Sequence, residues 1–110
     1  MKAIMLALLI ILFLPTFSFA AQIYGSLREG NRSVGQGVKV DVVCSDGTHS
    51  VVTDGYGSFN HFVKQRGKCT MVVYYGGQTP SAVIYSYDDP VRYDFDLIKQ
   101  GDGQYVLKRR

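Results

Sequence analysis

The sequence predicts an all-β domain, an antiparallel sandwich of seven short strands. Short runs rich in Val, Ile, Tyr, Phe and Thr recur along the chain, and Gly, Asp, Asn or Pro interrupts them at roughly ten-residue spacing. No stretch keeps apolar residues at helical spacing over three turns, and 12 glycines punctuate the chain. These observations favour strands over helices throughout.

The expected strands span residues 22–28, 38–44, 49–53, 58–63, 68–75, 82–87 and 91–98. Alternation is clearest in the second strand, where one face carries Val38, Val40, Val42 and Cys44. Lys39 and Asp41 then point away from the core. The fifth strand places Cys69, Met71, Val73 and Tyr75 on one face, and the seventh directs Tyr93, Phe95 and Leu97 inward.

Turn residues separate these runs. Asp46-Gly47 predicts a tight hairpin, because this pair adopts the positive φ angles that such turns need. After the seventh strand, Gly101-Asp102-Gly103 leads into residues 104–107. The pattern leaves this last run as either an edge strand or a loose tail.

The N-terminus has the three parts of a secretory signal peptide. Lys2 precedes an uncharged apolar stretch at 3–14, and Ser18 and Ala20 supply small side chains before a cleavage site after Ala20. Twelve residues of helix span about 18 Å, against roughly 30 Å of bilayer hydrocarbon, so the stretch favours a cleaved signal peptide over a retained membrane anchor. No stable membrane insertion is expected after cleavage. We therefore expect a secreted or periplasmic protein, with a signal peptide at 1–20, a sandwich at 21–98 and an edge strand or tail at 99–110.

Charge and composition exclude several functions. Loss of Lys2 lowers the net charge from +3 to +2, and no basic stripe interleaved with aromatics suggests nucleic-acid binding. His49 and His61 are expected to be exposed strand residues, too few for a zinc site. No Ser/His/Asp or Cys/His set stands out either. We expect a non-enzymatic protein without a metal or cofactor.

Cys44 and Cys69 are the two cysteines of the chain. In an exported protein such a pair favours a disulfide over a metal site or a redox pair. A bond needs Cα atoms about 4.4–6.8 Å apart, whereas facing sheets lie about 10 Å apart. The bond is therefore expected either between neighbouring strands or where the two sheets pinch together.

Four motifs follow one another in a familiar order. They are Ile23-x-Gly25-x-Leu27, Gly37-Val38-x-Val40, Thr53-Asp54-x-x-Gly57-x-Phe59 and Gly67-x-Cys69-x-Met71-x-Val73. Together, over about residues 22–98, they resemble the carboxypeptidase regulatory-like domain, also described as transthyretin-like or prealbumin-like. The resemblance implies a seven-stranded Ig-like or transthyretin-like sandwich and no catalytic residues. Members of this family act as folding partners, adhesive modules or binding modules.

The turn motif formed by Thr53, Asp54, Gly57 and Phe59 also has a physical interpretation. Asp54 can accept hydrogen bonds from the backbone of its own turn. Gly57 supplies a conformation that other residues avoid, and Phe59 returns the chain to the core. Where the family often has an aromatic residue after the second Gly, this chain has Cys69, so the disulfide is a local elaboration.

Eight tyrosines and no tryptophan suggest a binding surface. Tyr combines an apolar ring with a hydrogen-bonding tip and suits half-exposed positions. We expect Tyr74, Tyr85 and Tyr87 on outward faces and Tyr56 on a turn. The first hypothesis is a module that binds a partner protein or cell-envelope component by an edge strand or a tyrosine-bearing face. The alternative is a carbohydrate-binding module that stacks envelope glycans on Tyr56, Tyr74 or Tyr85.

Overall fold

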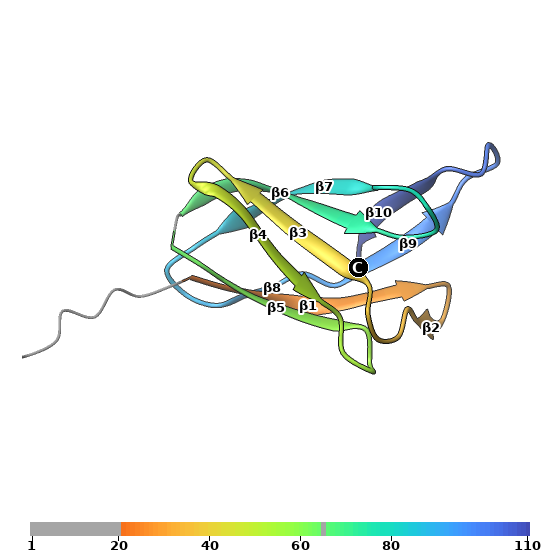
Figure 1. The fold of residues 1–110 in the computed structure, drawn as a ribbon, viewed down its shortest axis with the longest axis horizontal. Coiled ribbons are helices and arrows are strands. Elements are labelled where there is room, and N and C mark those ends of the chain that lie inside the picture. Colours follow the sequence, from red (N-terminus) through yellow and green to blue (C-terminus); the bar gives the residue numbers. More distant parts are fainter. Residues whose placement is uncertain (1–20, 65) are drawn as a thin grey trace, which may run out of the picture.

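The computed structural model describes residues 21–64 and 66–110, and this part of the chain contains strands and turns but no helix. The strands form two sheets whose inner faces share one hydrophobic core, so the fold is a sandwich-like all-β arrangement (Figure 1). The predicted all-β class is confirmed. The predicted signal peptide, residues 1–20, lies outside the described residues.

The first sheet has six strands and the second has four. The first contains β1 (Ala21–Glu29), β2 (Arg32–Ser33), β5 (Ser58–Val63), β8 (Val91–Arg92), β9 (Phe95–Lys99) and β10 (Tyr105–Arg109). The second has the order β4 (Gly47–Val52), β3 (Lys39–Cys44), β6 (Gly67–Tyr74), β7 (Ser81–Ser86). All pairings named for the second sheet are antiparallel.

β1 is the central strand of the first sheet. β5 pairs with it antiparallel along one edge, while β8 and β9 pair with it parallel along the other. β10 pairs antiparallel with β9. The parallel pairs correct the prediction of a purely antiparallel sandwich. Side chains alternate between faces with the same period in both arrangements, so the sequence pattern does not distinguish them.

The described residues form ten strands rather than seven. The first six predicted strands agree with β1, β3, β4, β5, β6 and β7 to within about two residues at either end, the usual uncertainty of strand boundaries. β2 is a short addition after the first turn. Of the two alternatives for residues 104–107, the edge strand is correct, because Tyr105–Arg109 pairs in register with β9.

The seventh predicted strand is interrupted at Tyr93 and Asp94, which separate β8 from β9. A Cβ atom on Gly25 would lie 1.8 Å from the carbonyl oxygen of Tyr93, so the chain crosses β1 in direct backbone contact. The Tyr93 N–H donates to the Tyr24 carbonyl at 2.8 Å. The next amide on this edge of β1 is that of Ser26. It donates to the Asp94 carboxylate at 3.0 Å instead of to a backbone carbonyl. The strand ladder breaks at this crossing.

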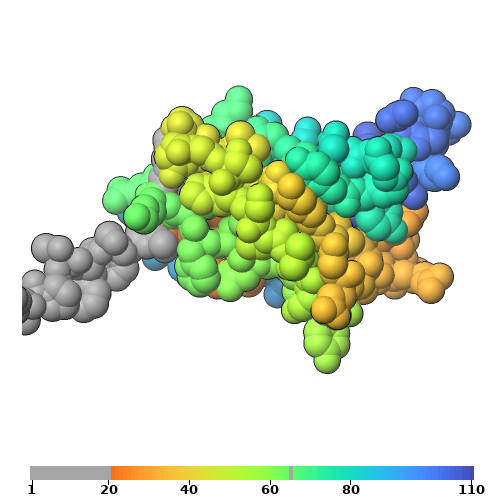
Figure 2. Space-filling model, in the orientation of Figure 1, coloured from red at the N-terminus to blue at the C-terminus, as the bar shows by residue number. Residues whose placement is uncertain are grey.

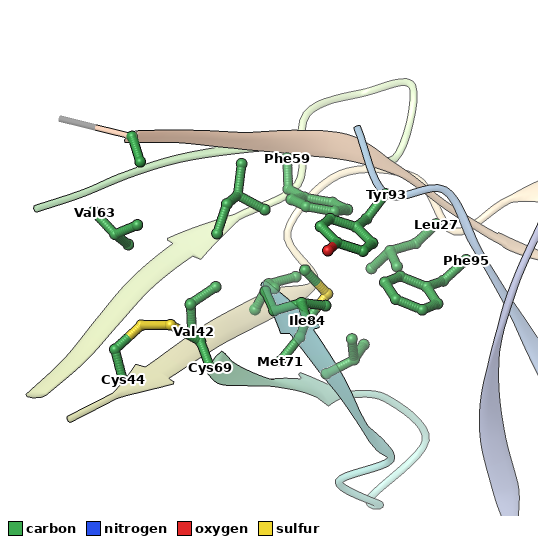
Figure 3. Close-up of a cluster of buried hydrophobic side chains, with 14 of the residues drawn as sticks. Leu27, Val42, Cys44, Phe59, Val63, Cys69, Met71, Ile84, Tyr93 and Phe95 are labelled. Carbon is green, nitrogen blue, oxygen red and sulfur yellow. A yellow bond between two sulfur atoms is a disulfide. The ribbon is translucent and has the colours of Figure 1, made fainter. Parts of the chain in front are cut away.

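The core lies between the two sheets and contains the residues that alternation predicted. β3 supplies Val40, Val42 and Cys44, β6 supplies Cys69, Met71 and Val73, and the last strands supply Tyr93, Phe95 and Leu97. β1 contributes Ile23 and Leu27, and Ile84 comes from β7. Figure 3 shows Tyr93 and Phe95 near one end of this cluster and the disulfide near the other.

His61 corrects the prediction that both histidines are exposed. Its side chain is 1% exposed, because it lies in phase with Phe59 and Val63 on the inner face of β5. No described residue bonds its Nε2 atom. Burial, with a smaller contribution from His49, lowers the pKa of His61 to about 4. His49 on β4 is half-buried. His61 is therefore a neutral residue of the core.

A disulfide joins Cys44 and Cys69. These residues follow the last register pair between β3 and β6, Val43 and Thr70, and so lie opposite each other on neighbouring strands. Their Cα atoms are 4.5 Å apart, the spacing of a non-hydrogen-bonded cross-strand pair. The bond therefore links neighbouring strands of one sheet and does not cross between sheets.

Candidate functional site

The predicted turn motif forms the tip between β4 and β5. The Asp54 carboxylate accepts hydrogen bonds from the N–H groups of Tyr56 at 2.9 Å and Ser58 at 3.0 Å. Gly57 has a φ of 72°, a conformation open mainly to glycine, and Phe59 is buried. The tip projects from the body of the molecule (Figures 1 and 2). Its geometry is that expected from the sequence.

Thr53 anchors the other end of this turn. Its side chain is buried, and its hydroxyl donates to the Gly35 carbonyl at 2.7 Å while accepting from the Val38 N–H at 3.0 Å. The motif residues thus bond to their own backbone surroundings and serve as a scaffold. What the scaffold presents is Tyr56, whose side chain is 83% exposed.

The four candidate tyrosines do not form one surface. Tyr74 on β6 and Tyr85 on β7 lie on the outer face of the second sheet, and Tyr87 directly follows the end of β7. Tyr56 lies on the β4–β5 tip. All four are exposed, as predicted. The structure therefore separates two candidate surfaces, one around Tyr74 and Tyr85 and one around Tyr56.

We define the valine–tyrosine face as the outward residues Val43, Val52, Val72, Tyr74, Val83 and Tyr85 of the second sheet. Three cross-strand pairings form a continuous row on this face, because Thr48, Val43, Thr70 and Val83 lie in register across β4, β3, β6 and β7. Five of the six named side chains are between 41% and 62% exposed. The face is a flat array of β-branched and aromatic side chains open to solvent.

Asp41 supports this face from within. It points outward, as predicted, but is only 6% exposed because its neighbours cover it. Its carboxylate accepts hydrogen bonds from Ser50 and from the Tyr74 hydroxyl, the latter at 3.0 Å. Lys39 lies 4.0 Å from the carboxylate and 4.7 Å from the Tyr74 ring centroid. The Ser50 hydrogen bond, followed by that of Tyr74, lowers the pKa of Asp41, and the same contact raises the pKa of Tyr74. Tyr74 is thereby fixed in place.

Glu29 joins two further tyrosines that the sequence did not single out. Its carboxylate accepts hydrogen bonds from the hydroxyls of Tyr75 at 2.6 Å and Tyr105 at 2.8 Å. These bonds lower the pKa of Glu29 and, with burial, raise that of Tyr75 to about 12. Gln78 adds bonds to the β9–β10 turn, at Gly103, and to the Tyr105 N–H. The cluster fastens the β9–β10 hairpin to the end of β6, and we interpret it as a structural clasp.

A polar cleft of about 450 Å³ lies on the outer side of the first sheet. β1, the β1–β2 turn, the β4–β5 tip and β8 contribute its lining, which includes Arg28, Arg92 and Tyr56. Below it, the Asp94 carboxylate accepts from the Ser26 N–H, from the Ser26 hydroxyl at 2.9 Å and from Arg92 Nε at 2.7 Å. The Arg92 and Ser26 hydrogen bonds lower the pKa of Asp94 against the opposing effect of burial. We call this the arginine cleft.

Within residues 21–64 and 66–110 no three His, Cys, Asp or Glu side chains come together in a way that suits a metal ion. The same ranges include no helix with the length and apolar character needed to cross a membrane.

Sequence reasoning missed most of what surrounds the tyrosines. Alternation predicts outward positions for Lys39, Asp41 and Tyr74, but it gives no information on which strands are neighbours. The row through β4, β3, β6 and β7 depends on pairing between segments far apart in the chain. The arginine cleft likewise depends on β8 lying beside β1.

No protein-family model matches the chain, and no curated protein matches it.

Proposed function

We propose that this protein is an exported, non-enzymatic binding module that docks a partner protein of the cell envelope on its valine–tyrosine face. The single observation that carries the proposal is the exposure of Val43, Val83, Tyr74 and Tyr85 on the outer face of one sheet, where Val43 and Val83 lie in one register row on either side of Thr70. Exposed apolar side chains that are contiguous indicate an interaction site, whereas scattered ones do not. Tyr is also enriched at the centres of protein interfaces.

The charges around the face indicate what kind of partner fits. Lys39 and Lys68 are exposed on the same outward positions as the valines, and Asp41 is buried and already paired. The accessible charge on these strands is therefore positive. A partner with an apolar centre and an acidic rim would complement it.

The surroundings of Tyr74 and Tyr85 favour protein over carbohydrate on this face. The cross-strand partners of Tyr74 and Tyr85 are Lys39 and Lys68, and Val72 and Val83 precede the two tyrosines on the same face. The Tyr74 hydroxyl is already engaged by Asp41, and Lys39 lies over its ring. We therefore assign the partner-protein function to this face.

Two observations support export and the family resemblance. A disulfide is compatible with an extracellular or periplasmic location, in agreement with the expected signal peptide at 1–20. The hydrogen bonds of Thr53 and Asp54 and the positive φ of Gly57 give these residues the turn-forming roles on which the resemblance rests. We accordingly propose that the domain is a carboxypeptidase regulatory-like sandwich of the Ig-like or transthyretin-like type.

Site-specific photo-crosslinking in the native cell tests the docking face. A photoreactive amino acid replaces Val83, which is 51% exposed on the valine–tyrosine face, or Phe62, which is 60% exposed on the outer side of the first sheet. We expect one discrete adduct from Val83 and none of that mass from Phe62. Equal adducts from both positions, or no adduct from Val83, would overturn the proposal.

A further inference from the structure

The arginine cleft has features that its role in the fold does not explain. It lies on the outer side of the first sheet, away from the valine–tyrosine face, which belongs to the second. Its volume of about 450 Å³ falls within the range of roughly 300–1,000 Å³ typical of small-molecule sites. Hydroxyl and amide groups of Ser33, Ser58 and Asn31 contribute to the lining. The cleft is thus sized and equipped for a small, hydroxylated ligand.

Arg28 gives the cleft a positive charge that no neighbouring carboxylate in the described ranges balances. The negative charge of Asp94 is balanced by Arg92, whose Nε lies 2.7 Å away. Asp96 is the cross-strand neighbour of Arg28, but it lies 3.2 Å from Arg110 and forms its ion pair there. No carboxylate of the described residues lies within ion-pair distance of Arg28. Its guanidinium is therefore available to an anionic group.

Tyr56 adds an aromatic ring at the rim. The ring is 83% exposed, and the turn backbone that carries it is held by the bonds of Asp54 and by Gly57. A Cβ on Gly57 would approach Ser33 Oγ to 2.5 Å, which shows how closely the tip packs on the β1–β2 turn beside the cleft. An accessible ring on a fixed turn suits stacking against the apolar face of a ligand ring.

We propose that the arginine cleft binds an acidic saccharide unit of the hexuronate type. The carboxylate pairs with the Arg28 guanidinium, whose planar fork matches carboxylate geometry. The sugar ring stacks on Tyr56, and its hydroxyls bond Ser33, Ser58 and Asn31. An isolated phosphate would use the cation but neither the ring nor the dispersed hydroxyl groups, so a sugar acid accounts for more of the lining. This site is independent of the proposed docking face.

Titration calorimetry with defined tetrasaccharides tests this assignment. The probes are tetramers of galacturonate, glucuronate and mannuronate, the neutral galactose tetramer, and inorganic phosphate. We expect saturable binding of at least one uronate tetramer and roughly tenfold weaker binding of the neutral one, because the Arg28–carboxylate pair is lost. Absence of saturable binding for all three uronates would overturn the proposal, as would equal affinity for the neutral tetramer.

Variants assign the binding to the cleft. Arg28→Gln and Tyr56→Ala should each weaken uronate binding roughly tenfold or more, by loss of the charged pair and of stacking. Lys64→Gln removes one positive charge from an exposed position outside the cleft and should leave the affinity unchanged. Equal weakening by Lys64→Gln indicates nonspecific charge attraction and contradicts the proposal. Phosphate competition together with no effect of Tyr56→Ala also contradicts it and indicates a simple anion site.

One further variant separates this site from the docking face. Val83→Lys alters the valine–tyrosine face and should leave uronate binding unchanged. The proposal for the arginine cleft and the proposal for the docking face can therefore be refuted independently of each other. Thermal unfolding of each variant confirms that it retains the native fold.

Discussion

The Tyr93 hydroxyl bonds both backbone groups of Tyr85: it accepts from the Tyr85 N–H at 2.9 Å and donates to the Tyr85 carbonyl at 3.2 Å. β7 is the last strand of the second sheet, so its outer edge has no neighbouring strand. A side chain from the first sheet thus occupies backbone groups that an added strand would need. This contact joins the two sheets and protects an edge from aggregation.

Tyr93→Phe should lower the free energy of unfolding by about 1–3 kcal/mol, because it leaves both backbone groups of Tyr85 without their partner. The ring and its contact with the Arg109 guanidinium, 4.2 Å from the centroid, are retained. Urea unfolding measures the change, with Tyr87→Phe as the control at an exposed position. Equal midpoints for Tyr93→Phe and the control would show that the bridge contributes nothing.

The contact also illustrates how far the sequence predicts this fold. Alternation placed Tyr93 in the core, but it gave no reason for the chain to leave the ladder there. The break follows from Gly25, which lets the Tyr93 carbonyl approach β1, and from Asp94, which takes the Ser26 amide. Local pattern predicts which face a residue occupies. Strand neighbours, and hence the row through Val43 and Val83, depend on pairing between distant segments.

Two differences between expected and observed burial also arise from pairing between distant segments. Asp41 and His61 were expected to be exposed, and both are buried. Asp41 is covered by Ser50 and Tyr74 from the strands on either side, which the sequence of β3 does not specify. By contrast, the Thr53–Phe59 turn was predicted correctly, because its bonds are local and each depends on one residue type.

Gly25→Ala should destabilise the protein by about 3 kcal/mol or more, since the new methyl group meets a backbone atom that has no free space to move into. The Cβ would lie 1.8 Å from the Tyr93 carbonyl oxygen and 2.5 Å from its carbonyl carbon. Gly101→Ala is the matched control, because a Cβ there meets no atom within 4 Å. Chemical denaturation compares the two. A small effect at Gly25, similar to that at Gly101, would contradict the crossing.

Removal of the disulfide should cost about 3.5 kcal/mol in the chain-entropy account, given a separation of 25 residues between the cysteines. The Cys44→Ala, Cys69→Ala double variant tests this by urea unfolding against the oxidised protein. The mass of unreduced protein provides the control, since the bond removes two hydrogen atoms. Free thiols in unreduced protein, or equal midpoints for the two forms, would refute the expected contribution.

Stability should fall as the pH drops from about 6.5 to about 4, because His61 has a lowered pKa in the folded state. The unfolded chain binds a proton on this residue in that interval and the folded chain does not, so acidification favours unfolding. The loss attributable to His61 is about 3 kcal/mol. His61→Leu should reduce the slope of unfolding free energy against pH above pH 4. An unchanged slope would show that His61 does not titrate as its burial requires.

The dissociation constant of the partner crosslinked at Val83 tests the central claim most directly. Val83→Lys introduces a charge into the valine–tyrosine face, and Phe62→Lys makes the same change at an exposed apolar position on the other sheet. We predict that Val83→Lys weakens binding by about 2 kcal/mol, roughly thirtyfold, while Phe62→Lys leaves it unchanged. Unchanged binding by Val83→Lys, or equal weakening by both variants, would contradict the assignment of the docking face.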